Sequence, residues 1–269
     1  MSVRLPVRRV GKPWGRERLP APFDEAGDTR RIGEIWFEPT ELTDRLLAKI
    51  LFTSERLSVQ VHPADETSPT GRGKDECWLV LDAEPGAMLG IGFAEPVSPE
   101  QVAQAAADGS IVDLLRWYPV EQGDFVSLPS GTVHAIGAGL TLAEIQQHTD
   151  ITYRLYDYGR PRELHLEQGL AVARLTPHPR DCWSRLDPAC SAILLAGPKF
   201  VVAHLSAGNP LDDAAQLTGP LLVLPLEPGV AVCGEDVPTG AAAECRGLAD
   251  IMLSAGARCL VAASVTPPA

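Results

Sequence analysis

A short turn in the middle of the chain constrains the fold more than any other feature of the sequence. Gly123 is followed, after five residues, by Pro129-Ser130-Gly131 and, after two more, by His134. Proline fixes φ and cannot donate to a strand ladder, and glycine adopts backbone angles that other residues resist. The segment therefore predicts a strand, a tight turn and a second strand. The second strand begins with the imidazole of His134, which we expect to point into the mouth of a small β-barrel.

Two further stretches place polar side chains on strands. Residues 57–62 alternate strictly, with Ser58, Gln60 and His62 on one face and apolar residues on the other. Successive side chains of a strand point to opposite faces, so these three polar groups should converge. Glu76 opens another apolar run, in which Trp78 shares its face. Both stretches are expected to contribute to the same barrel.

A third polar stretch follows the turn. From Ala143 to Tyr153 many positions alternate, which predicts one half-buried strand leading to Arg154. Its polar residues form either a solvated face or the wall of a polar site. Lys49 lies in another apolar run, and because lysine is seldom buried without a partner, we expect it to face a polar cavity or to reach solvent.

The chain reads as two β domains. Its 269 residues contain 24 glycines and 24 prolines, which suits many short strands joined by turns. We predict a first domain at residues 1–176, interrupted by short helices at about 98–117. In the second domain, residues 177–269, the stretch 189–266 has short apolar runs and one histidine, His204. It lacks the Pro-x-Gly-x2-His turn, and a packing role is expected for it.

Composition limits the possible partners. The net charge of −12 speaks against nucleic acid or an anionic membrane, but a few local cations suffice to bind one phosphate. The N-terminus does not resemble a secretory signal, and no apolar run approaches the length of a membrane span. Six scattered cysteines predict free thiols in a reducing compartment. We therefore expect a cytoplasmic protein.

The motifs together resemble a known family. Gly-x5-Pro-x-Gly-x2-His is similar to the second metal motif of the cupin superfamily. The longer strings Pro-Ser-Gly-Thr-Val-His-Ala-Ile-Gly (129–137), Glu-Ile-Gln-Gln (144–147) and Tyr-Arg-Leu-Tyr-Asp-Tyr-Gly-Arg (153–160) resemble type I mannose-6-phosphate isomerases in their short bacterial form. The resemblance implies a mainly β protein with a cupin-like jelly-roll barrel that carries the site and a second, degenerate cupin-like domain. It also implies interconversion of mannose 6-phosphate and fructose 6-phosphate through an enediol.

The resemblance implies a metal site made by Gln60, His62, Glu76 and His134. Two imidazoles, a carboxylate and an amide oxygen suit zinc and would tolerate other divalent ions. The family implies one Zn²⁺ per chain, which the ligand types alone would not select. Taken singly, His62 would more often be a half-exposed histidine and Glu76 a surface charge.

Catalytic roles are carried over from the family in the same way. Arg154 stands where the family has its essential arginine; the alternative is an ion pair with Asp150 or Asp157. Lys74 matches a lysine lining the site, or is a solvated loop charge. Glu144 is either the proton-transfer base or a support for these cations. The expected substrate-binding residues are Trp14, Lys49, Ser58, Asp150 and Arg160.

Two rival functions remain open at this point. The same fold and metal could serve an isomerase of another aldose or sugar phosphate. The chain could instead be a metal-dependent sugar-binding cupin without turnover, although such a protein would not need Arg154, Lys74 and Arg160 around the metal ligands. A small-molecule sugar phosphate is the partner expected for an enzyme.

Overall fold

Strands dominate the computed structural model, which describes residues 3–24 and 30–265. The first barrel has a seven-stranded sheet in the order β1-β2-β3-β10-β5-β8-β12, which faces a five-stranded sheet in the order β11-β4-β9-β6-β7. Its strands are β1 (Val7–Arg16), β2 (Ile32–Phe37), β3 (Leu46–Phe52), β4 (Val59–Val61), β5 (Glu76–Ala83), β6 (Met88–Phe93), β7 (Leu115–Pro119), β8 (Asp124–Leu128), β9 (His134–Ile136), β10 (Leu140–Gln147), β11 (Tyr153–Tyr156) and β12 (Trp183–Arg185).

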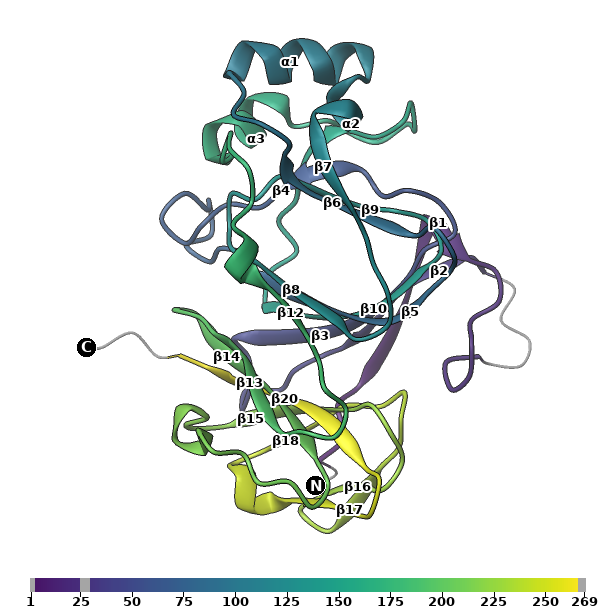
Figure 1. Ribbon diagram of the computed structural model, residues 1–269, viewed down its shortest axis with the longest axis vertical. Helices are drawn as coiled ribbons and strands as arrows, with labels where there is room; N and C mark the ends of the chain where they lie inside the picture. Colours follow the sequence, from purple (N-terminus) through teal and green to yellow (C-terminus); the bar gives the residue numbers. More distant parts are fainter. Residues whose placement is uncertain (1–2, 25–29, 266–269) are drawn as a thin grey trace.

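The second barrel is smaller and lies against the seven-stranded sheet (Figure 1). It pairs a five-stranded sheet, β13-β14-β20-β15-β18, with a three-stranded sheet, β17-β16-β19. Its strands are β13 (Ala192–Ala196), β14 (Phe200–Ser206), β15 (Leu221–Pro225), β16 (Val230–Val232), β17 (Glu235–Val237), β18 (Ala243–Cys245), β19 (Ile251–Leu253) and β20 (Arg258–Ser264). The predicted mainly β architecture with two barrels is therefore confirmed.

Three short helices cover the other side of the first barrel (Figure 1). They are α1 (Pro99–Asp108), α2 (Ile111–Leu114) and α3 (Leu166–Val172). Ser98 and Gln101 form a capping box at the start of α1. The prediction that helix extends to Trp117 is wrong: Trp117 lies on β7, where it pairs with Gly90. Pairing with β6 therefore ends the helical segment three residues early. None of the helices in the described ranges is both long and apolar enough to cross a membrane.

The predicted single strand from Ala143 to Tyr153 is two strands in two different sheets. β10 ends at Gln147 in the seven-stranded sheet, and β11 begins at Tyr153 in the five-stranded sheet. The chain crosses between the sheets at residues 148–152, where the Gln146 amide donates to the Thr149 carbonyl. Arg154 therefore does not lie on a strand that begins beside His134, as the sequence suggested. It lies across β4 from that histidine.

The strand pairing favours a boundary between the two barrels that differs from the predicted one. The predicted division at residues 176/177 separates β12 from the domain whose sheet it joins, because β12 pairs with β8. Conversely, Leu5 donates a backbone hydrogen bond to Ala242 of the second barrel. We propose that the second barrel begins near residue 190. The predicted outer limits, residues 1 and 269, lie outside the described residues.

One apolar core joins the two barrels. Ile35, Ile50 and Ile145 from the seven-stranded sheet share it with Phe200 and Leu260 from the second barrel. All are almost fully buried. The second barrel therefore covers the outer face of the sheet whose inner face lines the site.

Replacing Phe200 by alanine should lower the free energy of unfolding by about 3–5 kcal/mol, because it leaves a cavity in this shared core. Urea denaturation followed by tryptophan fluorescence measures the change. Met252→Ala is the control, since that side chain is 62% exposed and its loss should cost less than about 0.5 kcal/mol. A loss below about 1 kcal/mol for Phe200→Ala would contradict the shared core.

Candidate metal centre and active site

The Pro-Ser-Gly turn holds the segments of the site together. Gly131 has φ of +85°, and a Cβ there would lie 2.8 Å from the Val172 carbonyl oxygen, so only glycine fits. Its amide donates to the backbone carbonyl of His62 at 2.8 Å. The amide and hydroxyl of Ser130 both donate to the Asp75 carboxylate, beside Glu76. One turn thus fixes the backbone next to all three candidate ligands, including His134.

Cross-strand register then aligns side chains from the five-stranded sheet. Arg154 on β11 pairs with Gln60 on β4, and Gln60 pairs with His134 on β9. Residues directly opposite each other on neighbouring strands project from the same face. The Gln60 amide lies 3.2 Å from His134 Nε2, and Ser58 donates to the Gln60 oxygen at 3.0 Å. This row forms one wall of the site.

A second row crosses the seven-stranded sheet. Trp36 pairs with Lys49, Lys49 with Glu144, and Glu144 with Trp78. The Trp78 indole N–H donates to Glu144 Oε2 at 2.9 Å, and the Lys49 ammonium lies 4.4 Å from the centre of the Trp36 ring. Trp78 also meets His134 edge-on, with ring centroids 5.3 Å apart. The two walls are therefore in contact at the inner end of the site.

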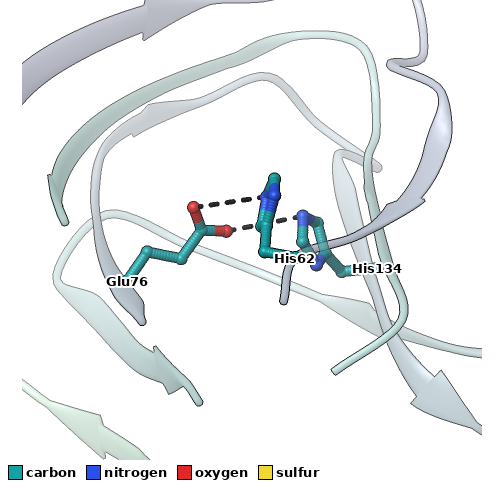
Figure 2. Close-up of side chains that lie close together, drawn as sticks. All are labelled: His62, Glu76 and His134. Carbon is teal, nitrogen blue, oxygen red and sulfur yellow. Dashed lines mark ion pairs between the residues drawn. The ribbon is translucent and has the colours of Figure 1, made fainter. Parts of the chain in front are cut away.

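His62, Glu76 and His134 form a buried group that could hold a metal ion (Figure 2). His62 Nε2 lies 3.6 Å from one carboxylate oxygen of Glu76, and His134 Nε2 lies 3.4 Å from the other. The candidate ligand atoms all lie within 4.8 Å of one another. The structure thus brings together three of the four predicted ligands. The fourth, Gln60, contacts His134.

Two features fit this group to a cation. Each histidine turns Nδ1 to a backbone carbonyl, that of Ile151 for His62 and that of Thr132 for His134, at 2.8 and 2.9 Å. Nδ1–H donation leaves both Nε2 lone pairs facing Glu76, the usual outer-shell arrangement of metal-binding histidines. In addition, Glu76 Oε1 is buried and has no hydrogen-bond partner in the described structure.

Burial keeps both imidazoles neutral, the form that binds metal. Desolvation lowers the pKa of His134 to about 4 and holds that of His62 well below its usual value, with Lys74 adding to both effects. Burial also raises the pKa of Glu76 to about 7, against the opposing charge of Lys74. A divalent cation would favour the ionised form of the Glu76 carboxylate, and the two neutral imidazoles could bind that cation.

Lys74 is not the solvated loop charge that the sequence left open. Its side chain is 5% exposed, and its ammonium lies 2.5 Å from Glu76 and 3.2 Å from His62 Nε2. Burial would lower its pKa, but Glu144 and Glu76 outweigh that effect and raise it. The predicted catalytic lysine is therefore charged and in direct contact with the candidate ligands.

Glu144 balances the two buried lysines. Its carboxylate lies 3.2 Å from the Lys49 ammonium and 3.8 Å from that of Lys74. Burial would raise its pKa, but Lys74 and Lys49, aided by the Trp78 hydrogen bond, lower it to about 2. Glu144 is thus an ionised group with fully engaged oxygens.

A polar cavity of about 320 Å³ opens in front of these groups. The predicted site residues that line it are Trp14, Lys49, Ser58, Gln60, Lys74, Glu144, Asp150 and Arg154. Arg160 does not line it: its guanidinium contacts Asp157, Glu55 and the Arg56 carbonyl. The substrate role assigned to Arg160 stays a prediction that this geometry does not favour.

Five charged or aromatic lining residues were not anticipated from the sequence: Arg8, Lys12, Glu34, Trp36 and Arg162. The first four come from β1 and β2, and the Pro/Gly-rich composition of the first segment hid its strand. Arg162 is held by two hydrogen bonds to the buried carboxylate of Asp157. Its position two residues after Arg160, in an irregular turn, gave no signal of which arginine faces the cavity.

Arg154 carries an unpaired charge into this cavity. Neither Asp150 nor Asp157 lies within ion-pair distance of it in the described structure; its guanidinium donates only to the Glu163 carbonyl, at 3.3 Å. Its Nε is buried without a partner. Burial and the neighbouring Arg162 lower its pKa. The proposed ion-pair alternative for Arg154 is therefore wrong, and its guanidinium is available to an anion.

Comparison with known proteins bears on this geometry. No family model matches the chain. The curated mannose-6-phosphate isomerase of Streptococcus mutans serotype c is 41% identical over 172 residues, which are 58% of this chain and 53% of the relative. The chain spans about half the length of the curated relatives it matches. The resemblance predicted from the motifs is confirmed as sequence similarity to proteins of this name.

Solved structures extend the likeness to the whole fold. The crystal structure of the mannose 6-phosphate isomerase from Bacillus subtilis gives a TM-score of 0.74 over 96% of this chain and 98% of that one, at 22% identity. A mannose 6-phosphate isomerase bound with zinc and yttrium gives 0.69 over 98% and 100%, at 13% identity. The predicted cupin-like architecture is therefore confirmed.

Proposed function

We propose that this chain is a metal-dependent aldose–ketose isomerase that interconverts mannose 6-phosphate and fructose 6-phosphate through an enediol. One observation carries the proposal: the buried His62–Glu76–His134 group, which could hold a metal ion, is contacted by Lys74, and Lys74 lines a cavity together with the unpaired Arg154. Sequence similarity to mannose-6-phosphate isomerases supports this choice of reaction. We place the reaction in the cytoplasm, with a free sugar phosphate as the only partner required.

Gln60, His62, Glu76 and His134 would hold one Zn²⁺. The ion would act as a Lewis acid towards a sugar oxygen. In the structure Ser58 donates to the Gln60 oxygen and Lys74 donates to the Glu76 carboxylate. Zinc is our proposal because two imidazole nitrogens and two oxygens suit it, and because a structural neighbour binds it.

The other residues of the cavity have distinct roles in this proposal. Arg154 faces the cavity with a free donor and would stabilise negative charge on the enediolate oxygens or orient the substrate. Glu144, with a pKa of about 2 and both oxygens engaged, is a poor proton acceptor. Of its two predicted roles we therefore favour support: it holds Lys49 and Lys74 in place.

Arg154→Ala distinguishes an enzyme from a sugar-binding protein. We expect kcat/KM to fall by about 10²–10³, the usual cost of losing a donor to a developing oxyanion, while metal content and melting temperature stay unchanged. Arg185→Ala is the control, because that guanidinium is exposed and pairs with Glu121 rather than lining the cavity. It should alter kcat/KM by less than about threefold. Unchanged turnover in Arg154→Ala would remove the role proposed for this residue.

The proposal is tested with purified, metal-quantified protein. Production of fructose 6-phosphate from mannose 6-phosphate is followed before and after chelation, and after zinc is restored. Turnover that is lost on chelation and restored by zinc supports both metal and reaction. Bound metal without turnover would point to another sugar or to a binding protein, and turnover indifferent to metal content would overturn the site.

A further inference from the structure

We propose that Lys199 of the second barrel is a positioning residue for the loop that carries Lys74. This loop, residues 63–75, is called the metal-site loop below; it runs between His62 and Glu76 and supplies Lys74. The catalytic consequence of the inference rests on the proposed function, but the structural link does not. It gives the second barrel, for which the sequence predicted only packing, a direct contact with the active-site framework.

The two ends of the metal-site loop are joined through Asp65. One oxygen of its carboxylate accepts the Gly73 amide at 2.6 Å and the Gln147 side-chain amide at 3.0 Å. The approach is close: a Cβ on Gly73 would lie 2.5 Å from the Asp65 nitrogen. Asp65 thus closes the loop immediately before Lys74.

Further hydrogen bonds connect this loop to the candidate metal site. Lys74 donates its backbone N–H to the Pro63 carbonyl at 3.0 Å. Gln147 bonds to both backbone groups of Asp75, accepting from its amide at 2.9 Å and donating to its carbonyl at 3.0 Å. A displacement of Asp65 would therefore reach Lys74 and Asp75, and through Asp75 the Ser130 turn.

Lys199 supplies the only cation on Asp65 in the described ranges. Its ammonium lies 2.6 Å from the second carboxylate oxygen. Lys199 stands in the turn before β14, and its carbonyl accepts the Val265 amide at 2.8 Å, so its backbone is fixed to the end of β20. The lysine therefore reaches across from a rigid part of the second barrel.

The ion pair is not needed to dock the barrels. The apolar core described above joins them, with Phe200 directly after Lys199. The side chains of Lys199 and Asp65 are 29% and 31% exposed, so the pair contributes little to global stability. Its effect should be local: the ion pair should keep the metal-site loop ordered.

Hydrogen exchange measured by mass spectrometry on the metal-free full-length chain tests the link without any substrate. Lys199→Met should raise exchange of peptides within residues 63–75 about threefold, the scale of a partly exposed ion pair. Asp65→Ala should raise it about tenfold, because two further hydrogen bonds are lost. Lys199→Arg should restore protection. Combining Lys199→Met with Asp65→Ala should add nothing to Asp65→Ala.

Arg258→Met is the matched control. It removes a pair of similar length and exposure, Arg258–Glu227 at 2.7 Å, on the same barrel but away from the loop. It should leave exchange of residues 63–75 unchanged. Equal exchange in Lys199→Met and wild type, or an equal rise in Arg258→Met, would overturn the inference.

Kinetics then address the consequence for the proposed reaction. Lys199→Met should lower kcat about threefold with KM nearly unchanged, since Lys199 does not line the cavity. Unchanged kcat alongside raised loop exchange would overturn the positioning role. Wild-type protein that fails to isomerise mannose 6-phosphate would instead refute the proposed function, and the exchange comparison would still decide the structural link.

Discussion

Replacing His134 by alanine should abolish stoichiometric metal binding and reduce isomerase turnover on the order of 10³-fold or more, since Lewis-acid stabilisation is worth several kcal/mol. The reason lies in the geometry of the site: His134 Nε2 faces Glu76 at 3.4 Å and has no substitute on β9. Metal analysis by atomic emission and the coupled assay measure the two effects. Circular dichroism should show an intact fold, because the strand itself does not depend on the imidazole.

His148→Ala provides the control for this experiment. His148 lies in the crossing between β10 and β11, and its Nδ1 contacts the Asp44 carbonyl rather than any site residue. Metal content and turnover should stay within about twofold of wild type. Full metal occupancy in His134→Ala would show that the ion binds elsewhere.

Replacing Glu144 by glutamine should destabilise the fold by about 3–5 kcal/mol, because it removes the carboxylate paired with the buried Lys49 ammonium and leaves Lys74 with Glu76 alone. The substitution keeps the shape of the side chain, so loss of packing does not account for the effect. Thermal and urea denaturation of the metal-free protein measure it. Adding Lys49→Met to Glu144→Gln should recover part of the stability, because one charge of each sign is then removed.

The difference in stability between wild type and Glu144→Gln should depend on pH, with a sign that follows from the pKa of Glu144. The pKa of Glu144 falls from an ordinary 4.5 to about 2 on folding, so its ionised form contributes stability above pH 4.5. That contribution is lost as pH falls towards 2. The part of the stability gap between wild type and Glu144→Gln that comes from Glu144 should therefore narrow as the pH falls from about 4.5 to 2. A gap that widens on acidification would contradict the pairing.

Local patterns, read together with the family resemblance, were enough to anticipate that His62, Glu76 and His134 lie close together. Gly131 and Pro129 define a turn within a few residues, and strand alternation alone places Gln60 and His62 on one face. Glu76 begins its strand, as predicted. These features depend on neighbours in sequence, where period and turn chemistry are reliable guides.

The rim of the cavity depends on register and could not be predicted in the same way. Asp157 engages both Arg160 and Arg162, and only the three-dimensional course of the turn decides which guanidinium faces the cavity. The crossing after Gln147 was concealed because alternation continues through it. The Asp65–Lys199 contact joins residues 134 apart, and no local pattern indicates it.

The burial of β10 on both faces has a consequence for any attempt to obtain a minimal enzyme. All eight of its residues are buried: Glu144 lines the cavity, and Ala143 and Ile145 lie in the apolar core shared with the second barrel. A fragment cut near residue 190 would keep every proposed ligand yet expose an apolar sheet face directly behind them. Such a fragment should aggregate rather than fold. We therefore expect that the first barrel is not an autonomous module, and engineering that shortens or exchanges the second barrel must supply a new apolar cover for the strand that also carries Glu144.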